Sequence, residues 1–387
     1  MKVLHVIPSV STVHGGPSRA IIDMEQALSR RGLSVTTITT DDDGDDKRLS
    51  VPLEKAVVEP YATRWYFART TVFYKVSLGL VRWLNRNVVG FDVVHTHSLF
   101  SFAPVMAARI ARRAGVPYVL RPLGVLARYG MEQRRPHLKR MSFNLLERGL
   151  IESAAAVHFT SRAERAQAEA LGLNCRAVVI PLGIDLKMES RRQGVQEAAG
   201  QIELLFLSRI DQVKNLEGLL RALQIVCRQD TRVFLRIAGD GDAQYVENLK
   251  SLAVSLGLAE RVTWLGYVSG ERKAAELAHA HIFVQPSHSE SFGIATIEAL
   301  AAGLPCIVSH GVAIHEDVTA ANAGVATSAD AQSIAQGILC LIAKREAWAV
   351  MSESAHRLAI EQFSLDAMGA RLESLYRDVA ARRALAA

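Results

Sequence analysis

The stretch QPSHSESFGIATIEALAAGLPCIVS, residues 285–309, contains the side chains best suited to chemistry. Glu290 lies just before a predicted helix, and Glu298 lies eight positions later, inside it. The two carboxylates are spaced to accept hydrogen bonds from two polyhydroxyl groups of one long ligand, each bond worth about 1.5–3 kcal/mol. Gly293 lets a ligand approach the backbone at the helix start, where free N–H groups form an anion site. The alternative interpretation is a capping glutamate and an exposed helical glutamate.

The segment LFLSRIDQVKNLEGLLRAL, residues 204–222, supplies two cations beside a predicted strand end. Arg209 and Lys214 bracket a short loop that precedes a predicted helix. Together they can neutralise a diphosphate, because Arg binds phosphate through a bidentate fork and Lys acts as a point charge. Taken alone, surface pairing with Asp211 or Glu217 is the simpler interpretation.

Short β-branched runs alternate with amphipathic helical segments along the whole chain, which predicts parallel sheets with crossover helices. The expected strands are 3–8, 34–40, 93–96, 118–120, 156–160 and 177–181, then 203–207, 232–238, 262–265, 282–285, 306–308 and 324–326. The expected helices include 18–31, 64–86, 102–114, 138–151 and 162–171, and three final helices at 331–343, 347–362 and 365–384.

The interval 185–200 is polar and without periodicity, which favours a boundary between two similar α/β domains. We expect a first domain of residues 1–182, joined by the C-terminal helix 365–387, and a second domain of residues 183–364. Doubly wound domains bind ligands at the carboxyl ends of their strands, so the expected active site lies in a cleft between the two.

The chain has 387 residues, of which 49% are hydrophobic and 22% are charged. This length supports two hydrophobic cores, and the composition excludes an intrinsically disordered chain. The four cysteines are far apart in sequence, which argues against a zinc knuckle, a redox pair and a secreted disulfide framework. No run of about 18 apolar residues occurs, and Pro8 breaks the opening apolar stretch early. We therefore expect a cytoplasmic protein.

Positive charge is concentrated in the first half of the chain. Residues 1–180 contain 25 Lys and Arg against 15 Asp and Glu, whereas residues 181–387 contain 20 against 24. Segment 63–87 mixes aromatic and basic side chains as interfacial membrane helices do, although a core helix with a basic edge has the same pattern. One hypothesis is that the first domain docks peripherally on anionic lipid at the inner face of the plasma membrane. No nucleic-acid module accompanies the charge, so nucleic acid is not an expected partner.

Several motifs, in their order along the chain, resemble a known family. They are HGGPSRAI at 14–21, DVVHTHS at 92–98, Arg209 with Lys214, LRIAGDGD at 235–242, LGYV at 265–268, and Glu290 with Glu298 followed by Ala-Gly-Leu-Pro. This order resembles the retaining nucleotide-sugar glycosyltransferases of family 4, over nearly the whole chain. The resemblance implies the GT-B fold, in which two Rossmann-like domains face each other across a cleft and the last helix crosses back to the first. It also implies a retaining glycosyltransferase of bacterial polysaccharide or lipopolysaccharide biosynthesis.

The same resemblance implies a role for individual residues. Arg209 and Lys214 hold the diphosphate of the donor and stabilise its charge as it leaves. Glu298 binds the ribose hydroxyls, and Glu290 binds the hydroxyls of the transferred sugar. The rest of the implied site is the backbone N–H groups of Phe292, Gly293 and Ile294, the nucleobase contacts near Tyr267 and Val268, and the loop of Gly15 and Gly16 that closes on the diphosphate. The implied partners are a nucleoside diphosphate sugar and a glycan or lipid-linked acceptor, with no cofactor.

Two positions depart from the family pattern. Many relatives have a His after the fourth strand of the first domain, where this chain has Leu123 in RPLGVL. The acceptor-side role of that histidine is left open between Arg121 and His97. In IPLGID at 180–185, Leu182 stands where Asn is common before the Gly.

Three groups of residues have side chains of the types that bind metals. The acidic run at 41–46 is expected to be a solvated loop, and Asp240 and Asp242 are expected to lie in a solvated turn. His95 and His97 share one face of a strand, but no third ligand is evident from the sequence. We therefore expect no metal.

The main alternative function is a nucleotide-sugar epimerase of similar two-domain fold, which would release free sugar or epimer without an acceptor. A nicotinamide oxidoreductase is disfavoured because the loop HGGPS lacks the spaced-glycine fingerprint. An inactive accessory subunit is disfavoured by the joint presence of the two cations and the two glutamates.

Overall fold

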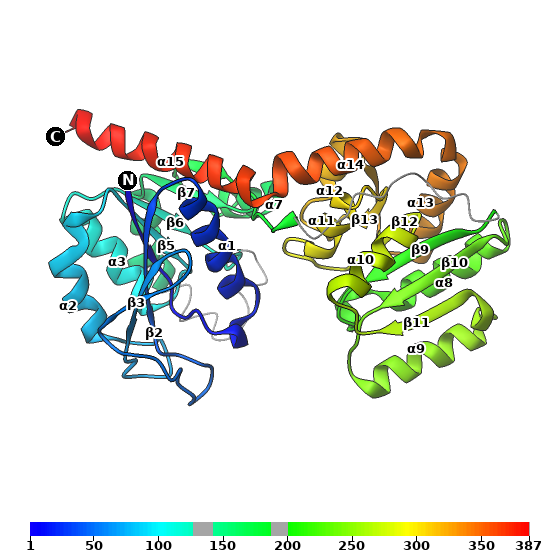
Figure 1. Cartoon of the computed structure of the whole chain (residues 1–387), viewed down its shortest axis with the longest axis horizontal. Helices are drawn as coiled ribbons and strands as arrows, with labels where there is room; N and C mark the ends of the chain where they lie inside the picture. The colour runs from blue at the N-terminus through cyan, green and yellow to red at the C-terminus, as the bar shows by residue number, and fades with distance from the viewer. Residues whose placement is uncertain (127–141, 187–199, 387) are drawn as a thin grey trace. The chain divides into compact units, whose positions relative to one another are not determined.

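The computed structural model describes residues 1–126, 142–186 and 200–386. The chain folds into two compact units. Unit 1 comprises residues 1–183 and 365–387, and unit 2 comprises residues 184–364. The expected boundary lies one residue earlier. Each unit is a mainly parallel sheet covered by helices (Figure 1).

Unit 1 contains an eight-stranded sheet in the order β3-β4-β2-β1-β5-β6-β7-β8. Neighbouring strands are parallel except the edge pair of β3 and β4. The strands are β1 (Lys2–Val6), β2 (Ser34–Thr40), β3 (Ala56–Val58), β4 (Thr63–Phe67), β5 (Val93–His97), β6 (Tyr118–Arg121), β7 (Ala156–Phe159) and β8 (Ala177–Val179). The α-helices are α1 (Gly16–Arg30), α2 (Leu78–Asn87), α3 (Phe102–Arg113), α6 (Arg148–Glu152), α7 (Arg162–Glu169) and α15 (Leu365–Ala386), with a π-helical turn at Phe143–Glu147.

Unit 2 contains a six-stranded parallel sheet in the order β11-β10-β9-β12-β13-β14. The strands are β9 (Ile202–Leu207), β10 (Val233–Ala238), β11 (Val262–Gly266), β12 (Ile282–Gln285), β13 (Cys306–Ser309) and β14 (Gly324–Thr327). The α-helices are α8 (Leu216–Cys227), α9 (Ala243–Ser255), α10 (Gly270–His279), α11 (Ile294–Ala301), α12 (His315–Ala320), α13 (Ala331–Ala343) and α14 (Trp348–Phe363).

The last helix, α15, belongs to the core of unit 1. Its apolar side chains, including Leu372, Tyr376 and Val379, are buried against α1 and the sheet, together with Met24 and Val93. Figure 1 shows α15 running beside α1 and the β5–β7 region. Burial of several such side chains, each worth about 1.5–3 kcal/mol, explains why residues 365–386 pack with the start of the chain.

The expected helix at 64–86 is wrong in its first part, which forms strand β4. Phe67 is 1% exposed, and Arg64 forms a buried ion pair with Glu25 of α1. Trp83 of α2 packs its ring against Phe67, with ring centroids 6.3 Å apart. Aromatic and β-branched residues fit a pleated, buried surface, so pairing with β2 prevails over the helical pattern. Most aromatic side chains of this segment therefore belong to the core.

The other expected strands begin and end within two residues of the observed ones. The expected helix 138–151 falls partly outside the described residues, as does most of the expected linker at 185–200. Among the helices that the structure describes, none combines the length and the apolar character needed to cross a bilayer.

Candidate functional site

The cations and glutamates singled out from the sequence gather at the carboxyl ends of β9 and β12, the central strands of unit 2. Arg209 and Lys214 follow β9, Glu290 follows β12, and Glu298 lies in α11. Since β10 pairs with one side of β9 and β12 with the other, this edge is the topological switch point of the sheet. Ligands of open α/β sheets bind at such a point.

Lys214 and Glu290 form an ion pair between these two loops. Lys214 Nζ donates to Glu290 Oε2, and the side chains are 14% and 20% exposed. Gln285 at the end of β12 donates to the same carboxylate oxygen from 3.2 Å. An ammonium group carries three N–H donors, so Lys214 can bind further acceptors while it holds Glu290. The pair therefore fixes a partly buried cation and a carboxylate side by side.

Glu298 has its own cationic partner, which was not apparent from the sequence. Lys273 of α10 donates to Glu298 Oε1 from 2.6 Å, and the Glu298 side chain is 15% exposed. The two glutamates are thus each paired with a lysine from a different part of unit 2. No sequence signal marked Lys273, because its partner lies 25 positions away on another helix.

Arg209 is the most open of the four side chains, at 78% exposure. Its Nε and Nη2 atoms donate to Asp211 from 2.9 and 2.8 Å. This is the local pairing that the sequence allowed as the simpler alternative. A guanidinium carries five N–H donors, so this pairing leaves donors that face water.

The GDGD motif positions the loop that carries Arg209. A Cβ atom on Gly239 would lie 1.8 Å from the carbonyl oxygen of Ser208, and one on Gly241 would lie 2.0 Å from that of Ile210. Only glycine permits this close approach of two backbones. Asp242 caps α9 by accepting a hydrogen bond from a backbone N–H of its first turn. The motif therefore has a packing role that its residue types alone did not reveal.

Gly293 begins α11 with a φ of +83°, a left-handed conformation that favours glycine. Beside it, the Phe292 side chain is 7% exposed and packs on Phe363, so only its backbone is available to a ligand. Val268 is likewise buried at 8%, whereas Tyr267 is 72% exposed after β11. Ile294 is also exposed, at 45%.

Gly15 and Gly16 lie after β1, which is the central strand at the switch point of the sheet in unit 1. Gly15 has a φ of +64°, and α1 begins at Gly16. A Cβ atom on either glycine would meet no atom within 4 Å, so the backbone here is open to a ligand. These residues belong to a different unit from the lysines and glutamates described above.

The acidic run at 41–46 is only in part the solvated loop that the sequence predicted, because Asp45 and Asp46 are exposed whereas Asp41 and Asp42 are buried. Asp41 and Asp42 are 2% and 1% exposed. Asp42 accepts hydrogen bonds from His14 Nε2 at 2.7 Å and Lys75 Nζ at 2.5 Å, and its other carboxylate oxygen forms an ion pair with Arg69 Nη1 at 2.9 Å. Burial alone would raise the pKa of Asp42, but the hydrogen bonds and charges of these partners outweigh it and lower the pKa. Asp42 thereby ties the residue before the glycine loop to the body of unit 1.

The central strands of unit 1 carry a buried histidine cluster that the sequence revealed only in part. The ring nitrogens of His5, His95 and His97 lie within 4.8 Å of one another, so β1 supplies the third imidazole that was not evident from the sequence. His5 Nδ1 lies 2.7 Å from His97 Nε2, and His95 Nδ1 lies 2.7 Å from the Tyr376 hydroxyl of α15. Burial, with the charge of Arg121, lowers the pKa of His5 to about 3.

Arg121 and His97, the two alternatives for an acceptor-side role, are both buried, at 2% and 0% exposure. Burial lowers the pKa of the Arg121 guanidinium to about 10. The positive charge of Arg121 also opposes a metal cation among the histidines. Both side chains are therefore almost entirely shielded from solvent in this structure.

The backbone at the carboxyl ends of β5 and β6 is strained. Ser98, Phe100 and Leu123 have φ values of +86°, +54° and +62°, which non-glycine residues adopt at a cost of order 1 kcal/mol or more. Leu123, at the position where the family resemblance implies a histidine, is half-buried in this turn. Leu182 is half-buried against the core that includes Met368. Strain of this kind is common at ligand sites, so this edge is a second candidate region of unit 1.

Two family descriptions match the chain. Residues 15–183 match "Glycosyl transferase 4-like domain", and residues 187–358 match "Glycosyl transferases group 1". The "Phosphatidyl-myo-inositol mannosyltransferase" of Mycobacterium leprae is 29% identical over 80% of this chain and 78% of its own length. The "Alpha-monoglucosyldiacylglycerol synthase" of Streptococcus pneumoniae is 29% identical over 57% of this chain, which spans about half of that relative.

Solved structures share the fold at lower identity. Sucrose-phosphate synthase of Thermosynechococcus elongatus superposes with a TM-score of 0.69 at 20% identity, over 99% of this chain and 100% of that one. The Anabaena protein HepE, in complex with UDP, superposes with a TM-score of 0.72 at 18% identity, over 98% and 100%. With two matching domains in this order and this fold, the chain belongs to the group 1 glycosyltransferases of the GT-B fold.

Proposed function

We propose that the protein transfers a sugar from a nucleoside diphosphate sugar to a glycan or lipid-linked acceptor, with retention of the anomeric configuration and without a metal ion. Family membership supports the reaction class. The names of two relatives, a phosphatidylinositol mannosyltransferase and a glucosyldiacylglycerol synthase, support a lipid-linked acceptor. A nucleoside diphosphate donor agrees with the UDP bound to HepE.

The observation that carries this proposal is the position of Lys214 and Glu290 at the switch point of unit 2, with Glu298 in the following helix. Lys214 is partly buried, which strengthens its attraction for a phosphate relative to a fully solvated lysine. The Glu298 carboxylate accepts hydrogen bonds from the ribose hydroxyls of the donor, and the Glu290 carboxylate accepts hydrogen bonds from the hydroxyls of the transferred sugar. Arg209 adds a second, more solvated charge for the diphosphate.

The chemistry requires charge stabilisation more than a protein nucleophile. As the anomeric bond breaks, the sugar becomes oxocarbenium-like and negative charge moves onto the diphosphate. Lys214 and Arg209 stabilise that charge, and this electrostatic stabilisation of the leaving diphosphate lowers the activation barrier. The acceptor hydroxyl attacks the anomeric carbon on the face of the sugar that the diphosphate leaves. The leaving diphosphate takes the proton of that hydroxyl. We assign no general base among the side chains.

Product analysis tests the reaction and separates it from the epimerase alternative. The protein would be screened by thermal shift against uridine, guanosine and adenosine diphosphates and their sugars, and the stabilising donor would then be incubated with lipid and glycan acceptors. A glycosylated acceptor with the donor's anomeric configuration supports the proposal. Release of free sugar or epimer with every acceptor would favour the epimerase, and an inverted product would contradict retention.

To reach a lipid-linked acceptor, unit 1 is also proposed to contact anionic lipid. Its support is the charge of residues 1–180, since most aromatic residues of segment 63–87 are in the core. Phe73 is an exception, at 66% exposure. Co-sedimentation with anionic vesicles tests this contact, and binding no stronger than to neutral vesicles would refute it.

A further inference from the structure

Unit 1 contains a pocket of about 610 Å³ whose lining includes none of the residues of the proposed reaction. It is lined by Arg112, Gly115, Val116, Pro117, Tyr118, Ser153, Ala155, Val379, Arg382 and Arg383. The residues from 116 to 118 lead into β6, and Ala155 precedes β7. The pocket is therefore at the amino ends of these strands, at the edge of the sheet opposite the glycine loop. Its volume is within the range of about 300–1,000 Å³ that small-molecule sites occupy.

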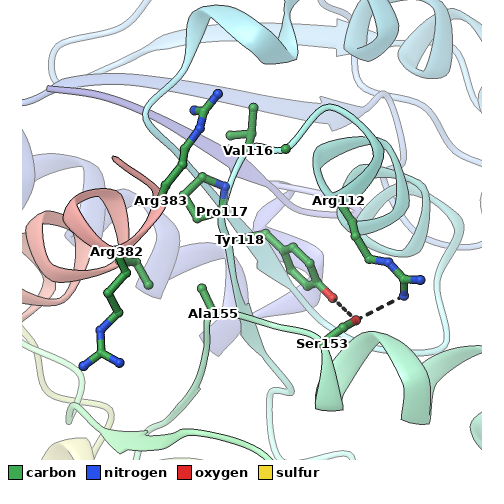
Figure 2. A pocket seen from close by; sticks show the side chains of 10 residues that line it. Arg112, Val116, Pro117, Tyr118, Ser153, Ala155, Arg382 and Arg383 are labelled. Carbon is green, nitrogen blue, oxygen red and sulfur yellow. Dashed lines mark hydrogen bonds between the residues drawn. The ribbon is translucent and has the colours of Figure 1, made fainter. Parts of the chain in front are cut away.

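The lining carries three arginines and no acidic residue. Figure 2 shows Arg112 of α3 on one side of the pocket and Arg382 and Arg383 of α15 on the other. Within the described residues, Arg112 and Arg383 have no carboxylate partner, and Arg112 Nη1 donates to Ser153 Oγ at 3.3 Å. Arg382 shares Asp378 with a further arginine, so it is partly neutralised. Two guanidinium groups therefore lack a counter-charge.

A structural explanation for these arginines also exists. Arg112 and Arg383 lie in the last turns of α3 and α15, where cations stabilise the helix macrodipole. Each helix end carries about half a negative charge. The two helix ends and Asp378 together offset about two of the three positive charges of the arginines. About one positive charge therefore remains in the pocket after the helix dipoles are compensated.

The floor of the pocket is apolar and fixed. Val116, Tyr118 and Val379 are all buried, at 2%, 2% and 1% exposure. The Tyr118 hydroxyl donates a hydrogen bond to the carbonyl oxygen of Leu150 at 2.5 Å. It also lies 2.9 Å from Ser153 Oγ, a contact that Figure 2 shows as a dashed line. A preformed apolar floor below exposed guanidinium groups suits a ligand with an anionic head and a less polar body.

We propose that this pocket binds a phosphomonoester, through Arg112 and Arg383 and with support from Arg382. The planar guanidinium fork matches the oxygens of a phosphate group and binds it in a bidentate manner. The phosphomonoester has two sources, a soluble phosphorylated metabolite or the head group of phosphatidic acid. The site does not depend on the donor site of unit 2, because all of its residues belong to unit 1.

The test compares a pocket variant with a charge-matched control. The pocket variant is Arg112→Gln with Arg383→Gln. The control is Arg86→Gln with Arg113→Gln, which removes two exposed arginines from the last turns of α2 and α3 outside the pocket lining. Both variants change only exposed side chains, and circular dichroism would establish that they fold. Binding of glycerol 3-phosphate, with glycerol as the uncharged reference, would be measured by calorimetry, and binding to phosphatidic acid vesicles by co-sedimentation.

We expect the pocket variant to bind at least one phosphate probe about tenfold more weakly than the native protein and the control. Loss of glycerol 3-phosphate binding identifies a soluble ligand, and loss confined to phosphatidic acid vesicles identifies a lipid head group. The proposal is overturned if the native protein binds neither probe, or if the control loses as much affinity as the pocket variant. Donor binding in unit 2 would be measured in parallel, and we expect it to be unchanged.

Discussion

Lys214, which follows β9, donates a hydrogen bond to Glu290, which follows the neighbouring central strand β12 of unit 2. This relationship gives the two residues linked roles. The ammonium group holds the carboxylate in place, and it retains donors for an anion. A second lysine, Lys273, does the same for Glu298. The two glutamates are thus oriented by the protein itself before any polyhydroxyl ligand binds.

Removal of the two cations should reduce turnover to different extents. We expect Lys214→Ala to lower kcat by about 100-fold, because a partly buried charge that stabilises the leaving group is lost. Arg209→Ala should lower kcat less, because its side chain is 78% exposed and water screens its charge. Steady-state transfer rates with the donor found by thermal shift measure both effects. A larger loss for Arg209→Ala would contradict this order.

Glu298→Ala should weaken binding of the donor by about 1.5–3 kcal/mol, because the hydrogen bonds to the ribose hydroxyls are lost. Calorimetry with the nucleoside diphosphate sugar measures the change. Glu247→Ala is a suitable control, since that glutamate is 63% exposed on α9 of the same unit. If donor affinity and transfer are unchanged in Glu298→Ala, Arg209→Ala and Lys214→Ala alike, the assignment of the site is wrong.

Asp42→Asn should impair turnover although Asp42 is only a positioning residue. The substitution leaves Arg69 and Lys75 without their buried counter-charge and weakens the bond to His14, so the glycine loop is released. We expect about a tenfold loss of kcat and faster hydrogen exchange in residues 9–16. Asp42→Glu, which keeps the charge, should recover part of the loss. Unchanged exchange in residues 9–16 would show that the contact does not order the loop.

Stability of unit 1 should fall as the solution is acidified below pH 6.5. Burial, and second the charge of Arg121, lowers the pKa of His5 and of His158 to about 3, and burial likewise lowers the pKa of His95 and His97. Below pH 6.5 the unfolded chain therefore binds protons that the folded chain does not. The free energy of unfolding then falls by about 1.4 kcal/mol per histidine for each pH unit below 6.5. The loss stops growing at the folded pKa, and it is not recovered at lower pH.

Hydrogen exchange of the β1 and β5 amides between pH 7.5 and 5.5, corrected for the intrinsic rate, measures this effect. His5→Gln removes one titrating group and should reduce the pH dependence. His279→Gln, which changes an exposed histidine in unit 2, should leave it as it is. Equal protection of these strands at both pH values would mean that the histidines are not buried in their neutral form.

The sequence predicted the parallel strands well because they are short, β-branched and bounded by polar turns. Because β9 and β12 were both expected, Lys214 and Glu290 could be assigned from the sequence to the carboxyl ends of parallel strands. Strand β4 was missed, because its aromatic residues continue into a helical pattern and its identity depends on pairing with β2. Local pattern carries no information about such a distant partner.

Contacts between distant residues account for the other differences. Asp42 is surrounded by acidic neighbours in sequence, yet its partners are His14 and two cations, Arg69 and Lys75. The third histidine, His5, faces His95 only through the register of β1 with β5. In both cases the residue types were visible, and the pairing of strands and loops decided their environment.

The central claim is that Lys214 binds the diphosphate of a nucleotide-sugar donor. The most direct measurement is the affinity of the corresponding nucleoside diphosphate for Lys214→Gln, compared with Lys250→Gln, which removes an exposed lysine from α9 of the same unit. We predict about a tenfold loss of affinity for Lys214→Gln and native affinity for Lys250→Gln. Equal affinities of the two variants would contradict the claim.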